Sequence, residues 1–236
     1  MASIQAIPKT NRLLAALPIE AQQLMLAGCE LIELRLADVL DNRGDTMRYV
    51  YFPIDSVISL VMPIHGDSGL GVGLIGNEGM LGTPLLLGID VAPFHAVIQK
   101  AGSVLRMAVP AFLHELEQNP TLLQLLKYYL HVVMSQLVQT SSCHRYHLIE
   151  ARLARLLLMI RDRVHTDTFH FTQELLSQLL GVRRVGVTKA AGSLQKKKLI
   201  GYSRGNVRIY DVSGLEATSC SCYQTDKETY NRILHC

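Results

Sequence analysis

The sequence predicts an α+β protein in which a β-rich N-terminal domain is joined by one long helix to a small basic domain. Three observations lead to this prediction. Short β-rich runs separated by turn residues fill Cys29 to Met107, apolar residues repeat at heptad spacing after Pro120, and a basic helix-turn-helix pattern covers Thr172 to Tyr210. With 236 residues, 49% of them hydrophobic and 18% charged, the chain can fold as two modest domains.

The chain opens with a predicted helix from Leu13 to Leu26, in which Pro18 stands in the first turn of the main segment. Residues 1–12 lack the basic-then-apolar order of a secretory signal, and no window reaches 18 uncharged apolar residues. The five cysteines have irregular spacing, which fits a reducing compartment better than a disulfide framework. We therefore expect a cytoplasmic protein without a membrane span.

Between Cys29 and Met107 the sequence reads as a series of short strands. The predicted strands cover residues 32–36, 49–53, 56–61, 70–75, 95–99 and 103–107, with turns at 41–45 and 65–69. Many short strands at this spacing indicate a sandwich or jelly roll.

The longest predicted helix begins at Asn119-Pro120 and reaches about Ser142. Its apolar residues follow at steps of 3, 4, 3 and 4, which is the a/d seam of two helices packed along each other. The seam residues are Leu123, Leu126, Leu130, Val133 and Leu137. A second apolar face can cover the N-terminal domain, so we expect the seam to form a homodimer. The alternative is that the seam packs on its own domain.

After a hinge at residues 142–147, an amphipathic helix from Leu148 to Val164 leads into the basic domain. Thr172 is a good N-cap for a short helix, and Gly181 is the turn before a second helix from about Arg183 to Lys197. Two short strands around a Gly-Asn turn at residues 203–206 then predict a β-wing.

The charge of this domain indicates its partner. Eight basic residues and no acidic residue lie between Leu175 and Tyr210, in a chain whose net charge is only +3. A surface of one sign attracts polyanions, and recognition helices carry their base-reading residues near the N-terminus. We predict contacts to double-stranded DNA from Thr172, Gln173, Arg183, Arg184, Thr188, Lys189 and Arg204. A solvated basic face without a partner is the alternative.

This segment resembles the winged helix-turn-helix of the Crp/Fnr superfamily, the cyclic-AMP receptor and fumarate-nitrate regulators. The matching residues are 171–176 (FTQELL), 179–184 (LLGVRR), Val187, 194–196 (LQK) and 199–200 (LI). With the upstream regions, the resemblance covers about Leu13 to Tyr210. It implies a bacterial homodimeric transcription regulator with RNA polymerase and a small-molecule effector as further partners. It also implies three parts: a β-roll sensor domain (a double-stranded β-helix like that of cyclic-nucleotide-binding proteins) at 1–118, a dimerisation helix with its hinge at 119–145, and a winged helix-turn-helix domain at 146–236.

The resemblance also places a phosphate-binding cassette at Gly76 to Gly82, with candidate ligand residues Glu78, Gly79, Gly82 and Thr83. For Glu78 the favoured interpretation is a surface carboxylate in a turn. Thr83, Pro93-Phe94 and Leu137-Val138 replace the ribose-binding carboxylate, the Arg-Ser pair and the Thr-Ser pair that hold a cyclic nucleotide in the superfamily. No arginine lies between Arg48 and Arg106. We therefore expect no response to cyclic AMP through the usual contacts.

Val185 stands where much of the superfamily has a base-reading glutamate, so the resemblance does not supply the operator sequence. Cys143 to His147 and Cys220 to Cys222 have loose or short spacing for a metal site, and a capping box at 213–216 predicts that Cys220 and Cys222 lie in a final helix. We expect no metal, no cofactor and, without a catalytic motif, no enzymatic activity, with redox sensing by these cysteines as a lesser alternative.

Two rival functions stay open. One is a small-molecule-binding β-roll protein whose basic domain serves another polyanion or a protein partner. The other is a cupin-like enzyme, which is disfavoured because the β-rich region offers only His65 and His95 as imidazole ligands.

Overall fold

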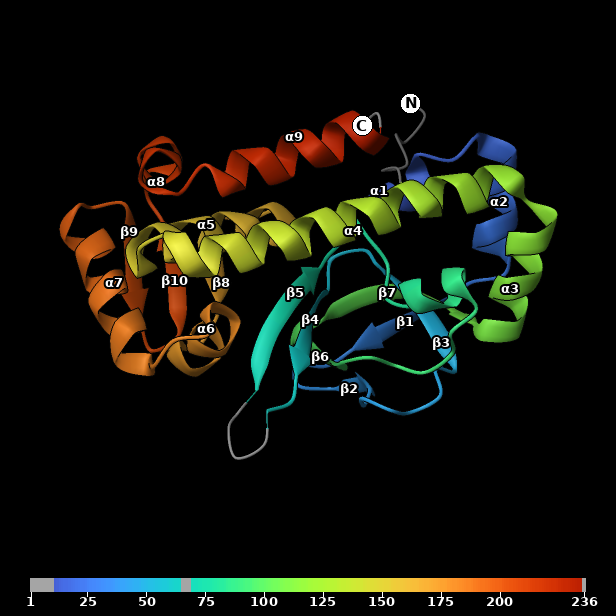
Figure 1. The fold of residues 1–236 in the computed structure, drawn as a ribbon, viewed down its shortest axis with the longest axis horizontal. Helices are drawn as coiled ribbons and strands as arrows, with labels where there is room; N and C mark the ends of the chain where they lie inside the picture. Colours follow the sequence, from blue (N-terminus) through green and yellow to red (C-terminus); the bar gives the residue numbers. More distant parts are fainter. Residues whose placement is uncertain (1–10, 65–68, 235–236) are drawn as a thin grey trace, which may run out of the picture.

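A computed structural model describes residues 11–64 and 69–234 of the chain. Within this part, a β-roll and a winged helix-turn-helix domain lie toward opposite ends of the molecule, and one long helix passes along both (Figure 1). Most of the turn expected at 65–69, including His65, lies outside the described residues.

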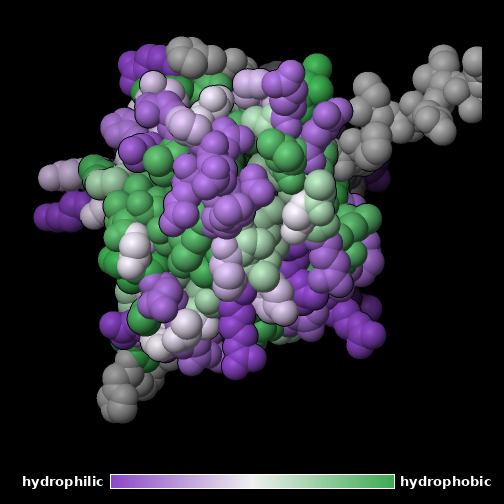
Figure 2. Space-filling model, turned by 90° about the vertical axis from the view of Figure 1, so that its right-hand side faces the viewer, coloured by the Kyte–Doolittle hydropathy of each residue, from purple (hydrophilic) through white to green (hydrophobic). Residues whose placement is uncertain are grey.

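The N-terminal segment forms two helices, α1 (Arg12–Ala15) and α2 (Ile19–Ala27). The prediction of one helix is wrong, because Pro18 is the N-cap of α2 with an extended backbone and the residue before a proline avoids the helical conformation. Asn11 caps α1 by accepting a hydrogen bond from Leu14 N at 3.1 Å. Figure 2 shows the face at the α2–α3 end, where hydrophobic and hydrophilic side chains gather in separate patches.

The roll consists of two antiparallel sheets. One has the order β1-β7-β3 and contains β1 (Glu30–Leu34), β7 (Gly102–Ala108) and β3 (Tyr49–Pro53). The other has the order β2-β6-β4-β5 and contains β2 (Val39–Asp41), β6 (His95–Lys100), β4 (Val57–Met62) and β5 (Leu70–Ile75). The six predicted strands are therefore present. The three-residue β2 was not predicted, because so short a segment cannot show an alternation.

Three helical segments adjoin the roll: η1 (Thr83–Leu87), α3 (Val109–Gln118) and α4 (Pro120–Tyr146). Helix α3 was not predicted. Helix α4 continues unbroken through residues 142–146, so the predicted end near Ser142 and the hinge at 142–147 are wrong, and the break comes only at His147. Asn119 separates α3 from α4 and caps α4 by accepting a hydrogen bond from Leu122 N at 3.0 Å. The face of α4 toward the roll is fully or almost fully buried, and its members are Leu122, Leu126, Tyr129 and Val132.

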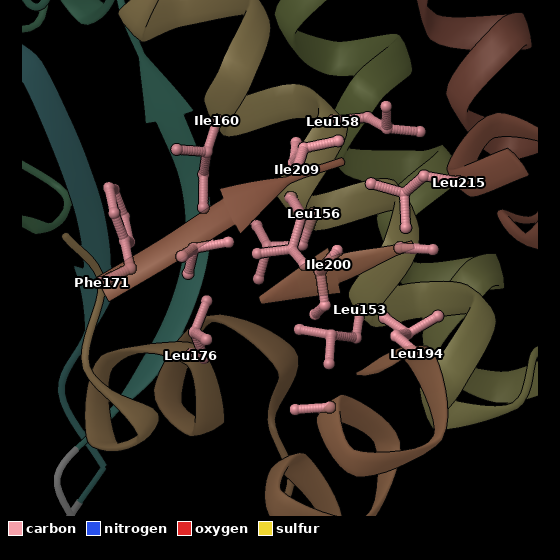
Figure 3. Packing of buried hydrophobic residues seen from close by; sticks show 14 of the residues in the cluster. Leu153, Leu156, Leu158, Ile160, Phe171, Leu176, Leu194, Ile200, Ile209 and Leu215 are labelled. Carbon is pink, nitrogen blue, oxygen red and sulfur yellow. The ribbon is translucent and has the colours of Figure 1, made fainter. Parts of the chain in front are cut away.

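The winged domain starts with α5 (Ile149–Val164), and its sheet has the order β8-β10-β9. The strands are β8 (Thr168–His170), β9 (Ile200–Ser203) and β10 (Asn206–Ile209), and β8 was not predicted. Helices α6 (Gln173–Leu180) and α7 (Arg184–Lys196) pack with α5 around a core drawn in Figure 3, in which Leu156 lies between Ile160 and Leu153 on α5 and faces Ile200 on β9. The Thr172 cap and the left-handed Gly181 turn, at φ 60°, confirm the predicted helix boundaries.

Two further helices close the chain, α8 (Val212–Thr218) and α9 (Cys222–Leu234). Asp211, not the predicted capping box at 213–216, caps α8 by accepting a hydrogen bond from Gly214 N at 2.9 Å. Cys220 lies in the break between the two helices, so the prediction that it is a helix residue is wrong. Helix α9 runs back along α4 (Figure 1), and Tyr230 Oη donates a hydrogen bond to Glu78 O at 2.7 Å. No helix among residues 11–64 and 69–234 has the length and apolar character to cross a membrane.

Candidate nucleic-acid interface

The N-terminal turn of α7 points its basic and polar side chains away from the protein. Val187, Ala190, Ala191 and Leu194 bury the opposite face of this helix. Arg183 is the extended N-cap residue, and Arg184, Thr188 and Lys189 are exposed. Val185 is also 59% exposed, so an apolar side chain stands among these polar ones. The sequence pattern assigned both faces of this helix correctly.

Gln173, the first residue of α6, links α6 to α7. Its Oε1 accepts hydrogen bonds from Arg184 Nε at 3.3 Å and from Thr188 Oγ1 at 3.1 Å. The neighbouring Thr172 Oγ1 accepts a hydrogen bond from Leu175 N at 3.2 Å. The N-terminus of α6 therefore lies beside that of α7, and Gln173 contacts the Arg184 side chain directly.

The β-wing turns at Arg204 and Gly205, both with positive φ, 50° and 84°. Two successive residues of positive φ make the turn type that suits a two-residue hairpin. The predicted Gly-Asn turn is therefore shifted by one residue, since Asn206 already belongs to β10. A left-handed arginine costs about 1 kcal/mol or more, so this backbone carries strain at a residue that faces solvent.

These elements surround a depression of about 320 Å³ lined by Thr172, Gln173, Arg184, Tyr202, Arg204 and Gly205. The structure thus unites four of the seven predicted DNA-contacting residues, while Arg183, Thr188 and Lys189 lie outside this lining. Sequence reasoning missed Tyr202, whose Oη donates a hydrogen bond to Phe171 O at 3.0 Å and whose pKa is raised by burial. Its position in the wing, opposite the start of α6, is a consequence of the strand pairing and has no local signal.

Side chains from four directions contact the predicted cassette, and Glu78 also lines an open depression of about 610 Å³. Glu78 Oε1 lies 2.9 Å from Arg163 Nε on α5, and these side chains are only 15% and 7% exposed. Asn11 Nδ2 donates a hydrogen bond to Gly79 O at 2.8 Å, Tyr230 from α9 holds Glu78 O, and Tyr129 of α4 stands where a Gly79 side chain would be. The interpretation of Glu78 as a surface carboxylate is wrong, because its side chain is only 15% exposed and is ion-paired with Arg163 of the winged domain.

Gly82 and Thr83 line a second site, an interior pocket of about 80 Å³ between the roll and α4. Drug-sized ligands occupy pockets of about 300–1,000 Å³, so this space is too small for a nucleotide as it stands. Among the described residues no arginine or lysine lines it, whereas Asp41 does. Burial, with a further contribution from the Asp45 carboxylate, raises the pKa of Asp41 to about 6.

The five residues of the predicted dimer seam differ in how deeply they are buried within the chain. Leu126 is fully buried inside its own chain, so its assignment to a seam between two copies is wrong. Leu123, Leu130 and Val133 are half-buried, and Leu137 is exposed. Met134 and Val138, which the heptad did not include, are exposed on the same half of α4. This helix therefore keeps an apolar surface beside the face that packs on the roll.

The cysteine-containing segments that the sequence treated separately come together. Cys143 and His147, at the end of α4, lie against Cys220 and Cys222, between α8 and α9. The two pairs are about 75 residues apart in the sequence, and the chain contains no spacing signal that relates them.

Comparison with known proteins agrees with this architecture. Residues 151–218 match the family model of the Crp-like helix-turn-helix domain. Among solved structures, the c-di-GMP responsive global regulator CLP of Xanthomonas campestris has a TM-score of 0.65 at 16% identity, covering 82% of this chain and 99% of that one. FixK2 from Bradyrhizobium japonicum has a TM-score of 0.66 at 12% identity, covering 81% and 98%.

A CRP/FNR-family transcriptional regulator from Thermus thermophilus has a TM-score of 0.62 at 19% identity, covering 80% of this chain and 98% of that one. At these identities the likeness establishes the fold. A search of curated proteins gives no match.

Proposed function

From the premise that this chain has the Crp/Fnr fold and carries a Crp-like helix-turn-helix domain at residues 151–218, we propose that it is a homodimeric, sequence-specific DNA-binding transcription regulator. Its parts are a sensor domain at 1–118, a dimerisation helix at 119–145, and a DNA-binding domain at 146–236. The fold's relatives are transcription regulators, and we propose no catalytic activity. We place its action in the cytoplasm, with RNA polymerase as a protein partner.

One observation carries this proposal: the depression in which the start of α6, the start of α7 and the wing meet. Helix N-termini attract phosphates, and a guanidinium can bind guanine by two hydrogen bonds in the major groove. We assign base reading to Arg184, with Thr188 and Lys189 beside it on the exposed face of α7. Arg183, at the N-cap of α7, faces the major groove with them, and Thr172, Gln173 and Arg204 contact the phosphate backbone.

The dimer proposal depends on the exposed apolar surface of α4. Helix α9 covers one flank of α4, and the roll covers another. The remaining surface includes Leu130, Met134, Leu137 and Val138, of which the last three are exposed. Apolar residues on a long helix are stabilised by pairing with the same helix of a second copy. Two DNA-binding domains related by a two-fold axis would then read two half-sites.

For the effector, we propose that the sensor domain does not bind cyclic nucleotides. Glu78 is ion-paired with Arg163, and the interior pocket has about 80 Å³ and no basic lining residue in the described chain. A buried cyclic phosphate without a cationic partner would be strongly disfavoured. We propose that specific DNA binding occurs without cyclic AMP, and that any effector is a small, largely apolar molecule.

The test is selection of random duplex DNA on the purified chain at moderate salt, followed by sequencing and by titration of the recovered sites with and without cyclic AMP. We expect two related half-sites, an affinity that falls steeply as salt rises, and no effect of the nucleotide. Failure of the recovered sequences to converge, together with salt-insensitive retention, would favour the rival function, a small-molecule-binding protein whose basic domain serves another partner.

A further inference from the structure

Four side chains with metal-binding atoms converge at the junction between the long helix and the winged domain. The Sγ atoms of Cys143, Cys220 and Cys222 and a ring nitrogen of His147 all lie within 4.8 Å of one another. The three cysteines are buried, and His147 is half-buried. None of the three thiols takes part in a disulfide.

We propose that Cys143, His147, Cys220 and Cys222 bind one Zn²⁺ ion in a tetrahedral Cys₃His site.

The distances fit this ion. Zinc binds thiolates at about 2.3 Å and imidazole nitrogen at about 2.0 Å, so the edges of its tetrahedron are about 3.8 Å between sulfurs and about 3.5 Å between sulfur and nitrogen. Cys143 Sγ lies 3.5 Å from Cys220 Sγ, and Cys222 Sγ lies 3.5 Å from His147 Nδ1. Three thiolates and one imidazole form a donor set that zinc prefers over hard cations such as Mg²⁺ and Ca²⁺.

The surroundings suit a negatively charged complex. Three thiolates and one Zn²⁺ sum to a net charge of about −1. The buried guanidinium groups of Arg152 and Arg155 lie close enough to Cys143 and Cys220 to interact with charge on their sulfurs, although Arg155 also pairs with Asp226 at 2.6 Å. Gln139 Nε2 donates a hydrogen bond to Cys222 Sγ at 2.8 Å, the kind of contact that orients a metal ligand. Cys222 is also the first residue of α9, where the helix N-terminus favours an anion.

Two simpler interpretations explain less of this geometry. A Cys143–Cys220 disulfide would need the sulfurs to approach to about 2.05 Å, and it would not explain why Cys222 and His147 lie beside them. Cysteines packed only as small apolar residues would need apolar neighbours. Ala151 is the one partly buried hydrophobic residue that packs on this cluster in the described chain, and imidazole, amide and guanidinium groups adjoin it as well.

The position of the site gives it a structural role. Cys143 and His147 precede the 151–218 domain, and Cys220 and Cys222 follow it. One ion would therefore join the end of α4 to the start of α9 and connect the two chain segments that flank the winged domain. A metal that binds only the folded arrangement stabilises it by its binding free energy. The ion would also hold α9 against α4 and thereby fix how the winged domain is oriented on the long helix.

The test begins with the metal content of the full chain, purified without an affinity metal and under reducing conditions. We expect about one zinc ion per chain, and loss of it on chelation should lower the melting temperature. His147→Ala and Cys222→Ser should each lower the zinc content severalfold, whereas the matched controls His144→Ala and Cys29→Ser should keep it. His144 neighbours the cluster without belonging to it, and Cys29 is a free thiol in the sensor domain.

Because a ligand variant can fail to fold, the demetallated wild-type chain is also titrated with Co²⁺. Intense visible absorption bands of tetrahedral cobalt–thiolate coordination, displaced by Zn²⁺, would support the site. Zinc below about 0.2 per chain together with no such bands, or a Cys143–Cys220 disulfide in the reduced-purified protein by mass spectrometry, would overturn it. Zinc content is measured without DNA, so this result is independent of the proposed DNA-binding function.

Discussion

The buried ion pair between Glu78 and Arg163 should be a major link between the sensor and winged domains. Glu78 lies in the glycine-rich turn after β5, and Arg163 lies near the end of α5. We consider the change Glu78→Gln, which keeps the size of the side chain and an oxygen that can still accept the hydrogen bond from Gly76 N, 3.3 Å away. Only the carboxylate charge is removed.

The expected loss of stability follows from how little of the two side chains is exposed to solvent. The side chains are 15% and 7% exposed and border an open depression of about 610 Å³, so the substitution leaves a largely buried guanidinium with little access to water. Removing one partner of a buried pair costs about 3–5 kcal/mol. Arg163 keeps one hydrogen bond, from Nη1 to Met159 O at 2.9 Å, and its Nε has no well-aligned hydrogen bond in the described structure. We therefore expect Glu78→Gln to lower the free energy of unfolding by about 2–4 kcal/mol, which corresponds to a fall in melting temperature of roughly 5–15 °C.

The matched control is Asp167→Asn, which removes one partner of a shorter but more exposed pair. Asp167 Oδ1 lies 2.6 Å from Arg161 Nε, with side chains 53% and 33% exposed. Exposed pairs contribute about 0.2–1 kcal/mol, so this variant should melt close to the wild type. Differential scanning calorimetry of both variants at pH 7 measures the difference. Equal losses, or a Glu78→Gln protein as stable as the wild type, would refute the argument from burial.

Three further predictions concern DNA binding, assembly and pH. Arg184→Ala should weaken binding to specific sites by about 1–3 kcal/mol and relax one base-pair preference per half-site, whereas Lys196→Ala should weaken all sequences equally, as measured by anisotropy titration on a set of operators. Leu130→Glu should give more monomer in sedimentation velocity, and an unchanged dimer would place the interface elsewhere. Burial raises the pKa of Asp41 from 3.8 to about 6. The folded state therefore loses stability as pH rises through that window, and Asp41→Asn should raise the unfolding free energy by about 1–3 kcal/mol at pH 7 but not near pH 3.5, by thermal denaturation.

Features with a local cause were predictable from the sequence. The Thr172 cap, the left-handed Gly181 and the hairpin near Gly205 each depend on a few adjacent residues, and all three lie within one residue of their expected place. The buried and exposed faces of α7 follow from the 3.6-residue period. This is why the candidate DNA-contacting residues could be proposed before any coordinates.

The heptad repeat on α4 is a feature that the sequence alone could not interpret fully. A repeat of apolar residues indicates that a face is buried, but not whether the roll, α9 or a second copy covers it. Leu126 belongs to the core of its own chain, whereas Met134 and Val138 lie exposed without a place in the repeat. Helix α9 covers part of α4, and its position depends on contacts such as that between Tyr230 and Glu78, which are 152 residues apart.

The turn at Gly76 to Gly82, where glycines were expected to admit an anion, also depends on contacts from distant parts of the chain. Here the absence of a side chain at Gly79 makes room for Tyr129, because a Cβ at that position would lie 2.0 Å from the tyrosine hydroxyl. Arg163 from α5 and Tyr230 from α9 reach the neighbouring Glu78. A turn that could contact a ligand instead joins the long helix, the winged domain and the C-terminal helix to the roll. The Glu78–Arg163 pair is therefore a direct contact between the roll and α5 that requires no anion in the turn.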